Sequence, residues 1–205
     1  ETVLSEGGER VRWANLGYKY DWTHRKYFEQ EPEISLPEIL VDLSKKALKT
    51  ANLTKYLENS YQPDSCLVNY YNVDTQFCGH IDDAELNARE FPIVSISIGL
   101  SAIFLHGKGE NCQDRKIKPE AIVINSGDVI IMSDTSRLCL HGVPRICEDS
   151  LVEKDLEHLF EVSEEEDPEF TVVERDYIMK HRLNINVRMY KGNVKIESNV
   201  SHVTD

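Results

Sequence analysis

Short hydrophobic segments follow one another through most of the chain after residue 63. In these segments valine, isoleucine, tyrosine or phenylalanine alternates with small or polar residues, which is the pattern of a β-strand with one buried face. Strands are predicted at residues 66–73, 92–100, 102–105, 121–125, 128–133 and 183–190. Ser126-Gly127, between two of these segments, is typical of a tight turn.

One amphipathic helix is predicted ahead of the strands. Its hydrophobic positions recur at helical spacing: Leu36, Ile39, Leu40, Leu43, Ala47 and Leu48. Ser35 and Glu38 have the spacing of a capping box and Pro37 suits a first turn, so we expect the helix to begin near Ser35. A second, short helix is expected to hold Leu53 and Leu57. Many short strands with little helix between them predict a mainly β protein with flanking helices, an antiparallel sandwich or jelly roll.

The size and charge of the chain narrow the class of protein. The 205 residues suit a single domain over 1–205, and the initial Glu1 indicates a piece of a longer chain. The net charge of −13 argues against nucleic-acid binding, but carboxylates concentrate in residues 148–174. We interpret this block as an exposed acidic insertion, which leaves a nearly neutral body able to carry a basic groove. The longest apolar stretch, 93–105, is too short to cross a bilayer, so no membrane partner is expected.

The cysteine count predicts the redox environment. The chain has five cysteines and no C-x-x-C pair, so neither a disulfide framework nor a zinc knuckle is expected. Free thiols are typical of a reducing, intracellular compartment.

The N-terminal segment, residues 1–34, mixes aromatic and basic side chains. Two interpretations are open. The segment is a lid that stacks on a flattened substrate such as a nucleobase, or its rings pack an additional layer on the core. The lid interpretation assigns substrate contacts to Tyr18, Tyr20, Trp22, Arg25 and Lys26.

A candidate metal site begins at His80-Ile81-Asp82. In an extended segment, residues two positions apart point to one face, so this imidazole and carboxylate can bind one ion. His141 is the best third ligand, because it follows the strand predicted at 128–133. Two histidines and one carboxylate on one face of an octahedron form the non-haem Fe(II) oxygenase arrangement. The pair alone is a weak signal, and His24, His106, His158 and His202 are expected at the surface.

The last predicted strand carries a second set of polar residues. Leu183, Ile185 and Val187 form its apolar face, and the opposite face consists of Arg182, Asn184, Asn186 and Arg188. If that face lines a barrel, its charges are costly unless an anionic ligand meets them. Arginine binds carboxylates in bidentate fashion, so a dicarboxylate cosubstrate is the natural ligand.

Together these motifs resemble the AlkB family of Fe(II)- and 2-oxoglutarate-dependent dioxygenases. The resemblance rests on the series His80-x-Asp82, His141 and Arg182-x-Asn184-x-x-x-Arg188. Asn69-Tyr70-Tyr71, Ser136-Arg137-Leu138 and the run from Arg12-Trp13 to Trp22 make the AlkB homologue 1 branch the most similar. The similarity covers about residues 11–190, with the acidic block as a variable insertion.

The resemblance implies a double-stranded β-helix, a jelly roll, with an N-terminal substrate lid. It implies Fe(II) held by His80, Asp82 and His141, and 2-oxoglutarate whose distal carboxylate pairs with Arg182. The rest of the cosubstrate pocket would consist of Asn69, Tyr71, Asn184 and Arg188.

The activity that the resemblance implies is oxidative demethylation of N-methylated bases in DNA or RNA, including tRNA. The reaction would consume O2 and release formaldehyde, succinate and CO2. A monomer in the nucleus or mitochondrion is expected. One position departs from the pattern: repair members carry an aspartate two residues after the iron aspartate, and this chain has Ala84. Two alternatives therefore stay open: a dioxygenase acting on a protein side chain or small molecule, and a jelly-roll scaffold with a vestigial site.

Overall fold

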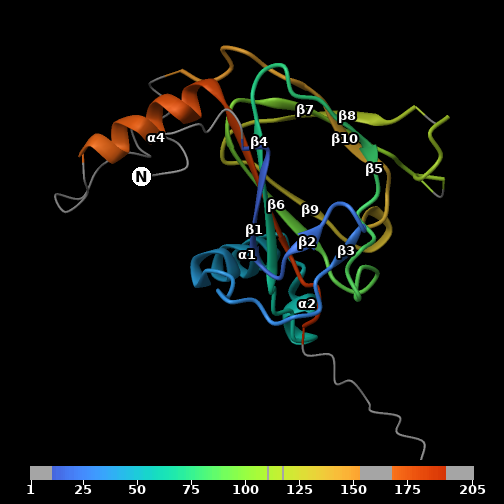
Figure 1. Ribbon diagram of the computed structural model, residues 1–205. Coiled ribbons are helices and arrows are strands. Elements are labelled where there is room, and N and C mark those ends of the chain that lie inside the picture. The colour runs from blue at the N-terminus through green and yellow to red at the C-terminus, as the bar shows by residue number, and fades with distance from the viewer. Residues whose placement is uncertain (1–10, 110, 117, 153–167, 193–205) are drawn as a thin grey trace, which may run out of the picture.

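The computed structural model describes residues 11–109, 111–116, 118–152 and 168–192. Two antiparallel sheets face each other, and helices cover the outer side of the larger sheet (Figure 1). The larger sheet has the strand order β1-β4-β11-β6-β9 and the smaller sheet has the order β5-β10-β7-β8. This mainly β arrangement confirms the predicted jelly roll.

The strands of the larger sheet are β1 (Trp13–Gly17), β4 (Ser65–Tyr71), β6 (Ile93–Gly99), β9 (Val129–Met132) and β11 (Arg182–Arg188). Those of the smaller sheet are β5 (Phe77–His80), β7 (Ala102–His106), β8 (Glu120–Ile124) and β10 (His141–Ile146). The short pair β2 (Tyr20–Asp21) and β3 (Lys26–Tyr27) forms a separate hairpin. The six predicted strands are present to within a few residues, whereas β1, β2, β3, β5 and β10 were not predicted as strands.

The helices are α1 (Glu38–Thr50), α2 (Thr54–Glu58) and α4 (Pro168–Lys180), with a 3₁₀ turn, η2, at Asp134–Ser136. The predicted start of the first helix was wrong. Proline restricts the preceding residue to extended conformations, so α1 begins after Pro37, and its N-terminus has no side-chain capping bond. Residues 153–167 of the predicted acidic insertion lie outside the described residues, and its last part belongs to α4, which was not predicted.

Alternation along β11 divides the molecule into two hydrophobic layers. Val187 lies on the outer face with Cys66 and Val94, where α1 and α2 cover it. A second core, which includes Tyr71, Ile93, Phe104 and Ile146, fills the space between the sheets. The inner face of β11 carries the polar residues, so the strand brings charged groups into the same space.

Gly99 allows the end of β6 to lie close to the start of β11. Its φ is +87°, and a Cβ there would collide with the backbone carbonyl of His181. Glycine therefore allows β6 to turn into β7 directly opposite Arg182, which is the register partner of Gly99.

Candidate metal and cosubstrate site

The two candidate histidine ligands lie opposite each other on neighbouring strands. His80 ends β5, His141 begins β10, and the two are register partners in the β5–β10 ladder. The ring centroids lie 4.3 Å apart. Each Nδ1 lies 3.0 Å from the backbone carbonyl oxygen two residues earlier, Cys78 for His80 and Cys139 for His141. A carbonyl oxygen only accepts, so Nδ1 donates and Nε2 is left free to bind a metal.

Asp82 completes the cluster. Its carboxylate oxygens lie 3.5 Å from His80 Nε2 and 3.6 Å from His141 Nε2. The three candidate ligand atoms all lie within 4.8 Å of one another. Ligands about 2.0–2.2 Å from one ion lie within about 4.4 Å of each other, so small side-chain adjustments close the cluster on a cation. Two imidazoles and a carboxylate are the donor set of non-haem Fe(II) sites.

Charge around Asp82 favours its ionised form. Burial alone would raise the pKa of Asp82, but the Arg188 guanidinium at 2.8 Å and the two histidines outweigh burial. The pKa of Asp82 therefore lies well below its ordinary value. Burial also lowers the pKa of His80, which keeps its imidazole neutral. Both groups thus have the protonation states that metal binding requires.

Arg182 supplies a buried positive charge to the same cavity. Its side chain is only 1% exposed, and it donates to Ser97 Oγ at 2.8 Å and to the Leu100 carbonyl at 3.2 Å. Its Nε has no hydrogen-bond partner, and no carboxylate in the described part of the chain pairs with it. Burial accordingly lowers the pKa of Arg182. A dicarboxylate ligand would both neutralise the charge and satisfy the donor.

The other residues expected around 2-oxoglutarate surround the same space. Asn69, Tyr71 and Asn184 line a cavity of about 660 Å³ together with the three candidate metal ligands and Arg182. Asn184 donates to Ser95 Oγ at 2.7 Å, so its orientation is fixed across the β6–β11 pair. The family cosubstrate therefore fits a cavity that contains both a metal donor set and a carboxylate-binding arginine.

Arg188 lines this cavity as well, but its charge is already balanced. It pairs with Asp82 at 2.8 Å and with Glu85 at 2.9 Å. The structure thus assigns Arg188 to holding the metal carboxylate in place. The direct contact with the cosubstrate expected from the sequence stays a prediction.

A buried ion network supports the site from behind, and the sequence analysis missed it. Glu85 and Arg137, 4% and 2% exposed, pair at 2.8 Å. Tyr27 donates to Glu85, and Arg137 also donates to the backbone carbonyls of Asp82 and Phe91. Glu85 stands beside Ala84, and Arg137 belongs to the quoted motif Ser136-Arg137-Leu138. These positions were the signal that the sequence offered.

Some residues of the N-terminal segment fit the lid interpretation and others fit the packing interpretation. Tyr20, Trp22 and Arg25 line the metal cavity, as the lid interpretation requires. Tyr18 is buried in an aromatic cluster with Tyr27 and Tyr190, which corresponds to rings packing on the core. Lys26 is exposed on β3 and is not part of the cavity wall. Residues 1–10 of the expected lid lie outside the described residues.

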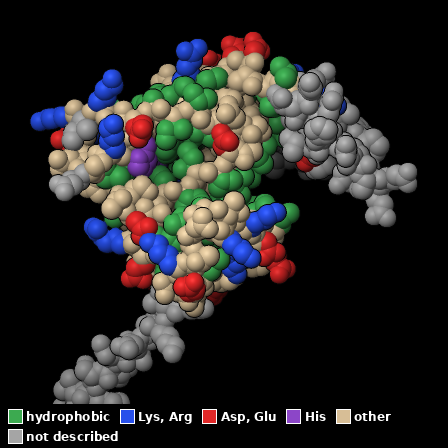
Figure 2. Space-filling model, turned by 180° about the vertical axis from the view of Figure 1, so that it is seen from behind, with side chains coloured by type: hydrophobic (Ala, Val, Ile, Leu, Met, Phe, Trp, Pro, Cys, Tyr) green, Lys and Arg blue, Asp and Glu red, His purple; other side chains and the backbone are tan. Residues whose placement is uncertain are grey.

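Figure 2 shows one face of the molecule on which a histidine lies beside hydrophobic side chains, with Lys, Arg, Asp and Glu side chains around them. Charges of both signs therefore border this face.

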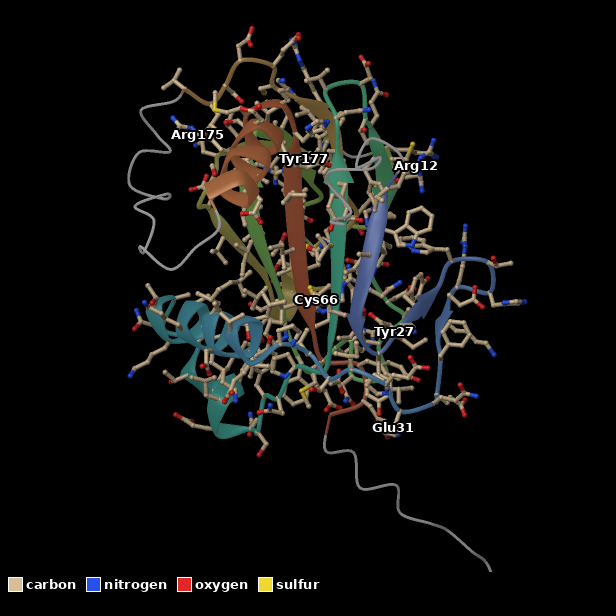
Figure 3. The ribbon with its side chains drawn as sticks, turned by 60° about the vertical axis from the view of Figure 1, so that its left-hand side comes forward. Arg12, Tyr27, Glu31, Cys66, Arg175 and Tyr177 are labelled. Carbon is tan, nitrogen blue, oxygen red and sulfur yellow. A yellow bond between two sulfur atoms is a disulfide. The ribbon has the colours of Figure 1, made fainter. Side chains whose placement is uncertain are left out.

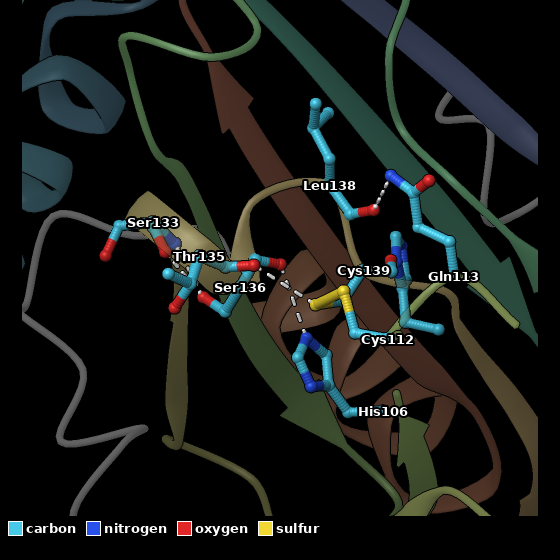
Figure 4. Close-up of a disulfide and its surroundings, with 9 residues drawn as sticks. His106, Cys112, Gln113, Ser133, Thr135, Ser136, Leu138 and Cys139 are labelled. Atoms are coloured by element: carbon cyan, nitrogen blue, oxygen red, sulfur yellow. Dashed lines mark hydrogen bonds between the residues drawn. A yellow bond between two sulfur atoms is a disulfide. The ribbon is translucent and has the colours of Figure 1, made fainter. Parts of the chain in front are cut away.

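A disulfide joins Cys112 to Cys139, so the expectation that all cysteines are free was wrong (Figure 4). The pairing ties the loop after β7 to the segment that leads into His141. The Leu140 amide also donates to the Cys112 carbonyl at 3.0 Å, and Gln113 Nε2 donates to the Leu138 carbonyl at 2.9 Å. The disulfide therefore fixes the backbone segment whose Cys139 carbonyl orients His141. With two of the five cysteines paired, the cysteine count no longer supports a reducing compartment.

Comparison with known proteins gives the class of this site. Residues 3–188 match the model of the 2OG-Fe(II) oxygenase superfamily, and the chain belongs to that superfamily. An Arabidopsis thaliana protein, DNA N(6)-methyladenine demethylase ALKBH1A, is 35% identical over 185 residues, which are 87% of this chain and 48% of that protein. The Schizosaccharomyces pombe tRNA demethylase abh1 is 34% identical over 142 residues, 69% of this chain and 44% of that protein.

A solved structure gives the same result for the fold. The structure of OsALKBH1 matches with a TM-score of 0.65 and 26% identity, over 86% of this chain and 77% of that chain. These relatives place the chain in the ALKBH1 branch of the AlkB family, which confirms the resemblance in the sequence. The superfamily implies Fe(II) and 2-oxoglutarate, and His80, Asp82 and His141 form the matching donor set.

The chain spans about half the length of the curated relatives it matches. Within the described residues no helix is both long and apolar enough to span a membrane.

Proposed function

We propose that this chain is an Fe(II)- and 2-oxoglutarate-dependent dioxygenase that oxidatively demethylates N-methylated bases in DNA or RNA, including tRNA. The observation that carries the proposal is one cavity that contains a His–Asp–His donor set, an unbalanced buried arginine and an aromatic, basic mouth. The bound metal, with 2-oxoglutarate and O2, supplies the oxidation of the N-methyl group, which then leaves as formaldehyde while succinate and CO2 are released.

The residues of the chain position the reactants for this chemistry. Arg182 binds the distal carboxylate of 2-oxoglutarate. Asn69 and Tyr71 form part of the wall of the same pocket. Arg188 holds Asp82 through the pair at 2.8 Å. His141 and Arg182, 7% and 1% exposed, lie on the buried side of the cavity, whereas the His80 side chain is 32% exposed and lies on its open side.

The substrate base enters from the side lined by Tyr20 and Trp22, with Arg25 available for a phosphate. A base in a duplex must first leave the stack, and aromatic side chains compensate for lost stacking. Ala84 lines the cavity and also packs against the Tyr18–Tyr27–Tyr190 cluster. The small side chain offers no hydrogen bond to a base, so the base contact that repair members make from this position is absent here.

Nucleoside analysis tests the proposal. The chain is incubated with Fe(II), 2-oxoglutarate, O2 and methylated DNA or tRNA, and formaldehyde and demethylated nucleosides are measured by mass spectrometry. We expect loss of an N-methyl mark that a His80→Ala variant does not produce. Succinate release with no change in any nucleoside would instead favour a protein or small-molecule substrate, and absence of succinate would favour a scaffold.

The assembly and location of the protein are also part of the proposal. We propose a monomer, which light scattering on the purified protein tests, and a location in the nucleus or mitochondrion, which imaging of the tagged full-length protein tests. A dimer in solution or a different compartment would overturn the corresponding statement without affecting the chemistry.

A further inference from the structure

A second cavity of about 680 Å³ lies next to the metal cavity. Its walls come from the start of β1, the end of β4, the connection to β5 and the end of α4. Seven of its lining residues carry rings: Trp13, Trp22, Tyr70, Tyr71, Phe77, Tyr177 and His181. Figure 3 shows Arg12 and Tyr177 at the same end of the larger sheet, Arg12 on the side of β1 and Tyr177 on α4. We call this space the β1–α4 cavity.

The β1–α4 cavity adjoins the metal cavity. Trp22, Asn69, Tyr71, Phe77 and Cys78 line both. The Phe77 ring lies edge-on to the His80 ring, with centroids 4.5 Å apart. One aromatic ring therefore separates the β1–α4 cavity from a metal ligand, and a ligand there is an immediate neighbour of a group bound at the metal.

Two rings of the β1–α4 cavity are accessible for stacking. Trp13 and Trp22 are 44% and 39% exposed, although large aromatic side chains are usually buried. Their centroids lie 5.5 Å apart with a tilt of 59°, so the two rings are not stacked face to face. The Tyr177 and His181 rings of the cavity wall stack on each other at 4.0 Å with an angle of 8°, and Tyr177 is only 9% exposed. The exposed tryptophans are therefore the rings available to a ligand.

The charge at the rim suits a phosphate-linked ligand. Arg12 is exposed on the wall, and no carboxylate of the described residues pairs with it. Asp74 is the acidic residue among those that line the cavity. A cavity with aromatic walls and one arginine matches the way proteins bind unpaired bases, by stacking on rings and pairing with phosphates.

We propose that the β1–α4 cavity binds the nucleotide next to the target base, with its base stacked on Trp13 and its phosphate near Arg12. This inference rests on the proposed function, because it assumes a nucleic-acid strand whose target base lies in the metal cavity. It adds a second binding site with its own residues, so the enzyme recognises at least two consecutive unpaired nucleotides.

Binding of an unmethylated, fluorescently labelled single-stranded pentanucleotide tests this site without requiring turnover. Trp13→Ala should raise the Kd by about tenfold or more, the usual cost of losing one base–ring stack. Trp13→Phe, which keeps a ring, should restore most of the affinity. Arg12→Gln should reduce the slope of log Kd against log salt by about one.

Phe28→Ala is the matched control, because Phe28 is a 47% exposed ring of the same N-terminal segment and lines neither cavity. We expect its Kd to equal that of the wild type. Equal effects of Trp13→Ala and Phe28→Ala, or no effect of either, would overturn the site. Melting temperatures identify a variant that fails to fold, and in that case Trp13→Phe and Arg12→Gln decide the outcome.

Turnover separates this inference from the proposed function. With an N-methylated pentanucleotide and the corresponding methylated mononucleotide as substrates, Trp13→Ala should raise the ratio of the two KM values by about tenfold. A wild-type protein that demethylates neither substrate would refute the proposed function. Demethylation of both with an unchanged KM ratio would refute only the second site.

Discussion

Removal of the Glu85 carboxylate should destabilise the protein although Glu85 is not a candidate metal ligand. The change is Glu85→Gln, which keeps the shape of the side chain and an oxygen for Tyr27 to donate to. The change removes the negative charge that pairs with Arg137 at 2.8 Å and with Arg188 at 2.9 Å. Arg137 is then left 2% exposed with only backbone carbonyls as partners.

The structure sets the size of the effect. Breaking one side of a buried ion pair costs about 3–5 kcal/mol, because the remaining charge stays buried and unbalanced. Arg188 keeps Asp82 and Arg137 keeps two carbonyls, so we expect the lower end, about 3 kcal/mol. In a chain of this size each kcal/mol shifts Tm by roughly 2–4 °C, which gives a decrease of roughly 6–12 °C.

Thermal unfolding of the metal-free protein, followed by circular dichroism, measures the effect. The matched control is Lys55→Met, which breaks a surface pair: Lys55 lies 2.6 Å from Asp134, and both side chains are about half exposed. We expect no measurable change there, because solvent screens the pair. The double variant Glu85→Gln/Arg137→Met should be less destabilised than the sum of its single variants. Equal Tm values for Glu85→Gln and Lys55→Met would refute the reasoning.

Four further changes test the site and the disulfide beside it. His80→Ala should abolish 2-oxoglutarate-dependent succinate release and keep the wild-type circular dichroism spectrum. Asp82→Ala should abolish succinate release and also lower Tm, because Arg188 loses a partner. Full activity in either variant would remove the metal assignment. Arg182→Ala should raise the KM for 2-oxoglutarate about tenfold to a hundredfold, as expected for one charge-assisted contact, and an unchanged KM would place the carboxylate elsewhere. Cys112→Ser, measured by thermal unfolding against a Cys147→Ser control, should destabilise by at most about 3–4 kcal/mol, because it opens a loop that spans 27 positions; equal Tm values would show that the disulfide adds no stability.

The candidate ligands and the arginine strand could be predicted because their signals are local. His80 and Asp82 stand two residues apart in one extended segment, and β11 alternates strictly between Arg182 and Arg188. In both cases the period of a strand decides which side chains share a face. The third ligand, His141, has no periodic relation to His80 along the chain. It was chosen because it follows the strand predicted at 128–133, and the family pattern then supported the choice.

The missed features depend on tertiary contacts. Glu85 and Arg137 look like surface charges in the sequence, and only the fold buries them together across 52 positions. Strand β10 was missed because Gly142 and Pro144 interrupt its hydrophobic pattern. The pairing of Cys112 with Cys139 could not follow from a count of cysteines, since the count does not specify which residues meet.

The position of β5 in its sheet determines how a metal ion leaves the protein. β5 has four residues and is an edge strand, which among the described strands pairs with β10 alone. Short edge strands open locally at a much lower free energy than the core of a sheet. Opening of β5 withdraws His80, while Asp82 stays paired with Arg188 and His141 stays in a strand that is still paired with β7 on its other side. Metal exchange is therefore coupled to fraying of one edge strand. We expect the opening rate of β5, measured by amide hydrogen exchange, to limit the rate of metal release while the rest of the fold remains closed.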